Sequence, residues 1–343
     1  MKILFFSYKF FPDVGGIEVN SEILANYFVE FGADVKLVTT SSSDDVNEEN
    51  FLFQVYRNPN ISQLFKLFNW ADIVYENNPC LSLAYPQIFF RKKHVIALRT
   101  WVSRLDGSQA LPDKLKKKWL LKADKIIAVS EEVRLRTFKD AVVIGNPYRA
   151  SLFVNLNIQK TRDFVFLGRV VSDKGADMCI ELIRKFSTED NFKNRRSFGL
   201  TIIGEGEDLI KLKALVNKLG LKDYVRFTGI LRGEELVKEL NKHFYLLAPS
   251  RWREPFGNVA LEGMASGCLP IVSDGGGLVD AVGNAGIIFK RNNDQDFYEK
   301  ISYLLQNSDY ENEVRANFTN HLENHKPQNV AKRYYQVIKD VYE

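Results

Sequence analysis

The sequence contains little cysteine and little histidine. Three of its 343 residues are cysteines and four are histidines. Cys80, Cys179 and Cys268 are odd in number and far apart, so they form neither a disulfide framework nor a metal-binding spacing. No His/Cys cluster of the kind that holds zinc is present. These absences favour a protein of the reducing cytosol without a structural metal.

The sequence also lacks a long apolar run and a strong net charge. No uninterrupted apolar stretch approaches the roughly 18 residues that span a bilayer. The apolar stretch after Met1 is too short for a signal peptide and is better explained as a buried first strand. A net charge of +4 is too weak to argue for nucleic acid as a partner. With 45% apolar and 26% charged residues, the chain has the composition of a soluble globular protein, and its length predicts two domains.

Short strand-like runs alternate with helical periods in both halves of the chain. This alternation predicts an α/β fold with parallel sheets covered on both faces, here as two Rossmann-like domains facing across a cleft. The expected domains are residues 1–150, residues 151–328 and a C-terminal helix over 329–343 that crosses back to the first domain. Ligands of such sheets bind beyond the carboxyl ends of the strands. The predicted strands are residues 3–7, 35–39, 73–75, 95–98, 126–129, 164–167, 200–203, 225–227, 244–248, 269–273 and 286–289.

Two carboxylates flank a predicted helix start at residues 253–263. Glu254 precedes the start, and Glu262 lies about one turn into the helix. Gly257 between them lets a ligand approach the backbone closely, and the free N–H groups of a helix start favour phosphate. A nucleotide sugar has hydroxyls for the carboxylates and a diphosphate for the helix start. An exposed turn followed by an ordinary polar helix face explains the same residues equally well.

Three further strand-to-helix junctions carry unusual residues. Gly15-Gly16 follows the first strand and could admit a phosphate, although any tight turn could use paired glycines. Arg169 and Lys174 share one loop and could clamp a diphosphate, although a solvated basic loop is the more common case. The segment 204–206, Gly-Glu-Gly, lacks the full Gly-x-Gly-x-x-Gly pattern and is better explained as a plain turn into the next helix.

Taken in order along the chain, these junctions resemble a known family. The ordered set closely resembles the motifs of retaining GT-B glycosyltransferases of glycosyltransferase family 4, over about residues 1–289. No single motif is decisive, but the order of the set is specific. The motifs are Gly15-Gly16-x-Glu18, Gly168-Arg169…Lys174-Gly175, Phe227-Thr228-Gly229, Pro249-Ser250…Glu254-x-Phe256-Gly257…Glu262 and Gly267-x-x-Pro270.

The resemblance implies a role for each matching residue. Glu254, Arg169 and Lys174 would be catalytic, with the carboxylate on the donor-sugar hydroxyls and the two cations on the diphosphate. Glu262 would bind the ribose. The full set that the resemblance assigns to donor binding is Gly15, Gly16, Gly229, Ile230, Phe256, Gly257, Asn258 and Glu262.

One position departs from the family pattern. Where the family often has His after the strand at 94–98, this chain has Arg99. Arginine stays protonated and cannot act as a general base. It could bind an anionic acceptor or a donor phosphate, or it could form a structural ion pair, and both interpretations stay open. Retaining chemistry of this type needs no protein base, because the leaving phosphate can take the acceptor proton.

The resemblance implies a nucleotide-sugar co-substrate and no metal. The only Asp-x-Asp, at residues 294–296, is better explained by a helix cap than by a metal site. Arginine, lysine and a helix N-terminus can replace a divalent cation electrostatically.

The expected function is sugar transfer from a nucleoside diphosphate to an acceptor hydroxyl with retention of configuration. UDP-sugar is the first candidate donor and GDP-mannose the second. The family implies a glycan or lipid-linked acceptor, as in bacterial cell-surface polysaccharide or lipopolysaccharide synthesis. The alternative is a nucleotide-sugar-binding protein without turnover. An NAD-dependent dehydrogenase is disfavoured by the incomplete glycine pattern.

Basic residues gather in the first half of the chain, at Arg91–Lys93 and between Lys114 and Lys122, with Trp119 among them. Lysines beside a tryptophan and leucines can bind an anionic membrane surface, whereas a charged helix face is more often simply solvated. The expected location is the cytoplasm, as the cysteine content indicates. The basic residues extend this expectation to peripheral binding at the inner membrane, and no nucleic-acid partner is expected.

Overall fold

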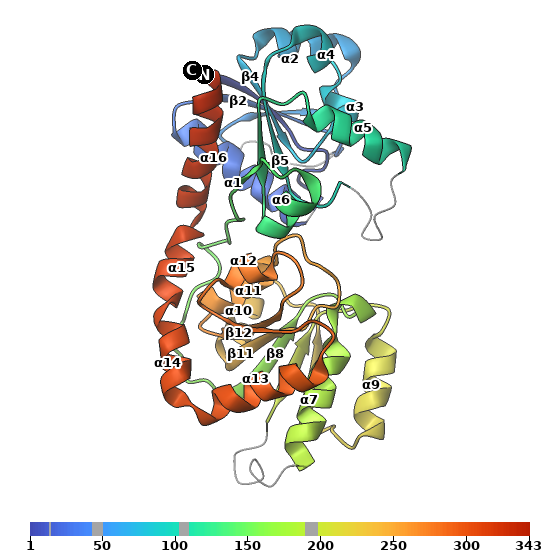
Figure 1. Cartoon of the computed structure of the whole chain (residues 1–343), viewed down its shortest axis with the longest axis vertical. Helices are drawn as coiled ribbons and strands as arrows, with labels where there is room; N and C mark the ends of the chain where they lie inside the picture. The colour runs from blue at the N-terminus through green and yellow to red at the C-terminus, as the bar shows by residue number, and fades with distance from the viewer. Residues whose placement is uncertain (14, 43–50, 103–109, 189–197) are drawn as a thin grey trace. The chain divides into compact units, whose positions relative to one another are not determined.

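The computed structural model describes residues 1–13, 15–42, 51–102, 110–188 and 198–343. The chain divides into two compact units (Figure 1). Unit 1 comprises Met1–Pro147 together with Pro327–Glu343, and unit 2 comprises Tyr148–Lys326. Val14, directly before the first glycine motif, lies outside the described residues. No described helix is long and apolar enough to cross a membrane.

Unit 1 is built on a seven-stranded sheet in the order β3-β2-β1-β4-β5-β6-β7, and all of its strand pairs are parallel. Its strands are β1 Lys2–Phe6, β2 Asp34–Thr39, β3 Gln54–Arg57, β4 Ile73–Asn77, β5 Lys93–Leu98, β6 Lys125–Ala128 and β7 Val142–Val143. Its helices are α1 Gly16–Glu30, α2 Ile61–Trp70, α3 Leu81–Ala84, α4 Gln87–Phe90, α5 Leu111–Leu120, α6 Glu131–Thr137 and α16 Pro327–Tyr342.

The helix α16 completes the core of unit 1 from the far end of the sequence. Val330, Ala331, Tyr334 and Ile338 are buried at helical spacing and join the core cluster that contains strands β1 and β4. The helix lies beside α1 (Figure 1). Removal of these side chains from water therefore stabilises a sheet whose strands come from the first 147 residues.

Unit 2 is built on a six-stranded parallel sheet in the order β10-β9-β8-β11-β12-β13. Its strands are β8 Arg162–Leu167, β9 Leu200–Ile203, β10 Val225–Gly229, β11 His243–Ala248, β12 Leu269–Ser273 and β13 Ile287–Phe289. Its helices are the 3₁₀ turn η2 Ser172–Lys174, α7 Ala176–Thr188, α9 Leu209–Lys218, α10 Gly233–Asn241, α11 Asn258–Ala265, α12 Leu278–Val282, α13 Asp294–Gln306, α14 Ser308–Ala316 and α15 Phe318–Asn324.

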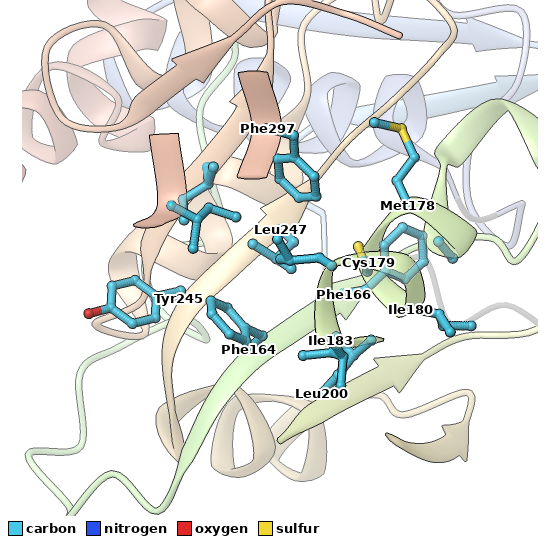
Figure 2. Close-up of a cluster of buried hydrophobic side chains, with 14 of the residues drawn as sticks. Phe164, Phe166, Met178, Cys179, Ile180, Ile183, Leu200, Tyr245, Leu247 and Phe297 are labelled. Carbon is cyan, nitrogen blue, oxygen red and sulfur yellow. The ribbon is translucent and has the colours of Figure 1, made fainter. Parts of the chain in front are cut away.

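The core of unit 2 forms where helices α7 and α13 cover the sheet. Phe164 of β8 and Leu247 of β11 pack with Cys179 and Ile183 of α7 and with Phe297 of α13 (Figure 2). Because helices cover the sheet, a central strand is buried on both faces rather than on alternate residues, as in β12, where all five residues are buried. The α/β prediction with two parallel sheets is thus confirmed. Of the strands in the described residues, the prediction omitted the short strands β3 and β7.

Each sheet has one point where the strand order reverses. In unit 1 it lies between β1 and β4, and in unit 2 between β8 and β11. Connections leave such a point in opposite directions, and open α/β sheets bind their ligands beyond the carboxyl ends of the two strands that flank it. The segments that follow β8 and β11 carry Arg169, Lys174 and Glu254.

Candidate functional site

Lys174 and Glu254 meet beyond the carboxyl ends of β8 and β11 in unit 2. Lys174 ends the turn η2, which follows β8, and Glu254 lies between β11 and α11. Their side chains form a salt bridge and are only 20% and 14% exposed. The hydroxyl of Ser250 donates to the same carboxylate oxygen of Glu254, at 3.0 Å. The structure therefore brings together two of the three predicted catalytic residues and adds Ser250, to which the sequence assigned no role.

The backbone fixes these two loops to each other. The carbonyl of Asp173 accepts hydrogen bonds from the backbone N–H of Arg251 at 2.7 Å and of Trp252 at 3.1 Å. Gly175 adopts a left-handed φ of +72°, and a Cβ there would stand 2.2 Å from the carbonyl oxygen of Pro249. Any other residue would push the loops apart. The close contact between these two loops thus holds the ammonium of Lys174 at the carboxylate of Glu254.

The main chain of Glu254 is held on its other side by the glycine run 275–277. Glu254 forms an isolated parallel bridge with Gly276, and the N–H of Gly277 donates to the Glu254 carbonyl at 2.7 Å. The sequence showed this run but not its partner. Glu254 is therefore positioned by its neighbours through both its side chain and its backbone.

Helix α11 begins directly after this segment. Gly257 is its N-cap residue, with a left-handed φ of +107° and no side-chain cap, and Asn258 is its first residue. Phe256 is buried, with its ring 5.6 Å from that of His325. A helix start of this kind presents the positive end of the helix dipole, which favours an anion.

Glu262 lies in α11, on the turn after Asn258. Burial raises the pKa of Glu262 from its ordinary 4.5, and the guanidinium of Arg149 acts in the opposite direction. Arg149 also lies over the ring of Phe153, at 5.4 Å from the ring centre. No sequence motif singles out Arg149, which stands at the start of unit 2, more than 100 residues before Glu262.

The remaining predicted donor residues of unit 2 lie near the same sheet edge. Arg169 follows β8 and is exposed, and among the described residues no hydrogen bond or ion pair to it is found. Gly229 ends β10 with a φ of +73°, and its carbonyl accepts from the N–H of Gly204 at 2.8 Å. Ile230 is 53% exposed. Arg169 and Ile230 thus lie on the loops after β8 and β10, and Gly229 is the last residue of β10. Both strands lie on the same side of the point where the strand order reverses.

The Gly-Glu-Gly segment 204–206 has a packing explanation. A Cβ on Gly204 would stand 1.9 Å from the carbonyl oxygen of Gly168, and one on Gly206 would stand 2.2 Å from that of Val170. The glycines allow the loop after β9 to lie against the loop after β8. The turn predicted here is confirmed, and α9 follows it.

In unit 1, Gly15 and Gly16 stand at the start of α1. Gly15 is the N-cap residue in an extended conformation, and its carbonyl accepts from Val19 N–H at 3.1 Å. At Gly16 a Cβ would meet no atom within 4 Å. The surrounding fold therefore leaves room for a side chain at Gly16, and its packing does not explain the glycine. Close approach of a ligand would explain it.

Comparison with known families decides the class of protein. The model of the family Glycosyl transferases group 1 matches residues 149–321, which is half of the chain. The protein is a group 1 glycosyltransferase. The predicted family resemblance is confirmed, and with it a retaining glycosyltransferase activity.

Two relatives match most of the transferase. An uncharacterised glycosyltransferase of Methanocaldococcus jannaschii is 27% identical over 333 residues, covering 90% of each chain. A subunit of the phosphatidylinositol N-acetylglucosaminyltransferase of Schizosaccharomyces pombe is 24% identical over 331 residues, covering 86% of this chain and 71% of the relative.

Solved structures share the fold of the transferase. HepE of Anabaena in complex with UDP matches with a TM-score of 0.80 at 16% identity, covering 99% of this chain and all of the other. The lipopolysaccharide outer core galactosyltransferase WaaB matches with a TM-score of 0.73 at 18% identity, covering 99% of each chain. The predicted GT-B architecture is thereby confirmed.

The position that departs from the family pattern, Arg99, lies inside unit 1 of the transferase. It directly follows β5, is 5% exposed, and its guanidinium donates hydrogen bonds to neutral side chains. No carboxylate of the described residues pairs with it. This arrangement favours a structural role, with neutral partners in place of the expected ion pair, over binding of an acceptor.

Trp119 of the transferase faces the interior and not the surface with the lysines. It is 6% exposed, and its indole N–H donates to Oε1 of the buried Glu76 at 2.7 Å. His94 shares the same oxygen, also at 2.7 Å. The expectation that Trp119 takes part in a membrane surface is therefore wrong: a tryptophan with a buried partner for its N–H stays inside.

The Asp-x-Asp segment of the transferase starts helix α13. The cap is formed by the preceding residue, because Oδ1 of Asn293 accepts from the Asp296 N–H at 2.9 Å. Asp296 accepts in turn from the backbone N–H of Lys290, at 2.6 Å. The predicted helix start is therefore confirmed, but the capping residue is Asn293 and not an aspartate of the Asp-x-Asp segment. Among the described residues, no group of three or more His, Cys, Asp or Glu could hold a metal ion.

Proposed function

We propose that this transferase moves a sugar from a nucleoside-diphosphate sugar to an acceptor hydroxyl, with a UDP-sugar as first candidate donor and GDP-mannose as second. The observation that carries the proposal is the group of Lys174, Glu254 and Ser250 beside the start of α11. It combines a cation and a helix start, which suit a diphosphate, with an oriented carboxylate, which suits sugar hydroxyls. The complexes of HepE with UDP and with UDP-glucose support uridine as the base.

In the proposed mechanism, binding of the donor sugar nucleotide changes the partner of Lys174. Without donor, the ammonium of Lys174 pairs with Glu254. The diphosphate would draw the ammonium away, and the carboxylate, still held by Ser250, would accept hydrogen bonds from the sugar hydroxyls. As the glycosidic bond breaks, negative charge grows on the leaving diphosphate. Lys174, Arg169 and the N–H groups at the start of α11 would stabilise that charge where it forms.

The other donor contacts extend from this centre. Glu262 would accept from the ribose hydroxyls, and the loop at Gly229 and Ile230 would lie near the base. Gly15 and Gly16 would contact the donor phosphates through the backbone. We propose that no metal is needed, because the two cations and the helix start meet the charge of the diphosphate.

We further propose a glycan or lipid-linked acceptor in cell-surface polysaccharide or lipopolysaccharide synthesis, on an anionic cytoplasmic membrane face. The role of WaaB as a galactosyltransferase of the lipopolysaccharide outer core supports this class of acceptor. Helix α5 and the turn after it support the surface: Leu111, Leu115 and Leu121 are 70%, 49% and 74% exposed, and Lys114 and Lys118 between them are exposed as well. Exposed leucines among lysines fit the boundary of an anionic bilayer.

The donor is tested by a thermal-shift screen of UDP, GDP and their sugars, followed by a measurement of product. A bound nucleotide at 100 times its Kd adds roughly 2.7 kcal/mol of stability. We expect stabilisation by UDP and release of UDP from one UDP-sugar when acceptor is added. Stabilisation without any turnover, across donors and acceptors, would contradict the proposal.

The membrane surface is tested by co-sedimentation with vesicles of neutral and of anionic lipid at low and physiological salt. Binding should require anionic lipid and fall when Lys114, Lys118 and Lys122 are changed to Glu. A matched control changes three exposed lysines of unit 2 to Glu, namely Lys218, Lys222 and Lys300. Equal loss in both variants would show a net-charge effect without a specific surface, and equal recovery with both lipids would refute the membrane proposal.

A further inference from the structure

Arg99 is a buried cation whose partners come from both segments by which the chain leaves and re-enters unit 1. Unit 1 is interrupted after Pro147 and resumes at Pro327. Arg99 is 5% exposed and stands just after β5, far from both breaks in the sequence. Placing a guanidinium inside a protein is costly unless its N–H groups find acceptors. The acceptors that it uses therefore indicate what it holds in place.

The first of these segments ends at Asn146 and Pro147. One terminal nitrogen of Arg99 donates to Oδ1 of Asn146 at 3.0 Å. Two residues earlier, the carbonyl of Ile144 accepts from the hydroxyl of Tyr334 at 3.0 Å. The segment is thereby fixed at two points immediately before the chain leaves unit 1.

The second segment is helix α16, which begins at Pro327. The same nitrogen of Arg99 donates to the hydroxyl of Tyr334 at 2.8 Å, and the guanidinium carbon lies 4.7 Å from the centre of the Tyr334 ring. The Tyr334 hydroxyl thus accepts from Arg99 and donates to Ile144. Both segments are joined through one guanidinium and one hydroxyl.

On its other side, Arg99 faces the start of α1 through Asn77, the last residue of β4. Nε of Arg99 donates to Oδ1 of Asn77 at 2.6 Å. A guanidinium can only donate, so the amide oxygen of Asn77 must face it and the NH₂ group must point away. That group donates to the hydroxyl of Ser21 at 2.7 Å and to the carbonyl of Ile17 at 3.3 Å. Ile17 directly follows Gly16.

We propose that Arg99 is a positioning residue that fixes the start of α1, with its glycine pair, to both segments connecting unit 1 with unit 2. The proposal rests on the proposed function, in which Gly15 and Gly16 contact the donor. Lysine could not replace arginine here, because an ammonium is a point donor and cannot present a planar fork to Asn77, Asn146 and Tyr334 at once.

The test uses three variants of the full chain. Arg99→Lys keeps the charge and loses the fork. Tyr334→Phe keeps the ring and loses only the hydroxyl, so it serves if Arg99→Lys does not fold. Tyr335→Phe is the control: it removes a hydroxyl from the next residue of α16, which donates to the Phe31 carbonyl at 3.3 Å, while its ring packs against Phe28 and Phe31 of the α1 region.

Two quantities are measured, amide hydrogen exchange in α1 and the response of the protein to UDP. We expect exchange of the amides of residues 18–21 to accelerate about tenfold or more in Arg99→Lys and Tyr334→Phe, because a buried hydrogen bond to a charged group is lost. Tyr335→Phe should leave it unchanged. With the donor found in the screen, kcat should fall about tenfold in the first two variants. The Kd for UDP should rise by no more than about threefold, because most of its proposed contacts (Arg169, Lys174 and Glu262) lie in unit 2 and only the glycine pair lies in unit 1.

The outcomes separate the two proposals. Unchanged exchange at residues 18–21 in both Arg99→Lys and Tyr334→Phe would refute the positioning role. So would an equal acceleration in Tyr335→Phe, which would show that packing of α16 against α1 is responsible. A wild-type protein that binds no nucleotide would refute the proposed donor, and the exchange data would still decide the role of Arg99.

Discussion

Replacing Glu254 by Gln separates binding of the sugar from binding of the nucleotide. Glutamine has nearly the same shape and keeps an oxygen that can accept from Ser250, which donates to the carboxylate at 3.0 Å. The fold should therefore be retained. The variant loses the negative charge that would face the sugar hydroxyls and that holds Lys174 in the absence of donor.

Loss of the charge that faces the sugar should lower turnover, whereas loss of the charge that holds Lys174 should not weaken the binding of UDP. A hydrogen bond to a charged group is worth roughly 1.5–3 kcal/mol, so turnover should fall about tenfold to a hundredfold. Binding of UDP should not fall. Lys174 and Glu254 are 20% and 14% exposed, and a pair of this partial exposure contributes up to about 1 kcal/mol. In Glu254→Gln no carboxylate competes with the diphosphate for Lys174, so the variant should bind UDP with equal affinity or up to about fivefold more tightly.

The measurement combines calorimetric titration with UDP and the rate of UDP release from the donor. A matched control is Glu234→Gln, which removes the carboxylate of an exposed pair with Lys238 elsewhere in unit 2 and should change neither quantity. A Kd for UDP that rises tenfold in Glu254→Gln, at unchanged melting temperature, would show that Glu254 binds the nucleotide and would refute the division of roles.

Three further predictions follow from the same site. Arg169→Ala and Lys174→Ala should each lower the affinity for UDP about tenfold to a hundredfold, as measured by calorimetric titration. Unchanged affinity in both variants would exclude the diphosphate clamp. Glu262→Gln should weaken the binding of UDP but raise the melting temperature near pH 7. Burial raises the pKa of Glu262, so above the ordinary pKa of 4.5 its ionised form destabilises the folded state, and this penalty disappears as the pH falls below 4.5. Melts at about pH 7 and pH 4 should show a gain only at the higher pH, and a gain at both would contradict this origin. Activity should survive EDTA, and loss with recovery on magnesium or manganese would refute metal independence.

The sequence predicted the features of the fold that depend on local pattern. Short strand-like runs alternating with helical periods indicated parallel strands, and the structure has them in two sheets. The pairing of Lys174 with Glu254 follows from their places after two strands that prove to be neighbours, β8 and β11. The shared motif order supplied the roles of the site residues, and these roles stay predictions; the comparisons confirm the family.

Contacts between distant segments could not be predicted from local pattern. Arg99 looked available for an acceptor because its partners, such as Asn146 and Tyr334, lie 47 and 235 residues away. Trp119 looked like a surface residue because helix α5 carries apolar side chains on more than one face, and only Trp119 and Leu120 of these are buried. In both cases a buried polar group found its partner through tertiary packing, which a single sequence does not display.

The assembly of unit 1 from two separated segments has a consequence for synthesis of the chain. Unit 2 is continuous in sequence and can fold as soon as its last residue emerges. Unit 1 cannot complete its core until α16 arrives, because Val330, Tyr334 and Ile338 belong to that core. During translation of about 180 intervening residues, the face of the first sheet that α16 covers stays accessible to water and to chaperones. A stop codon just before α16 should therefore leave unit 2 folded and the first-made half of the protein aggregation-prone.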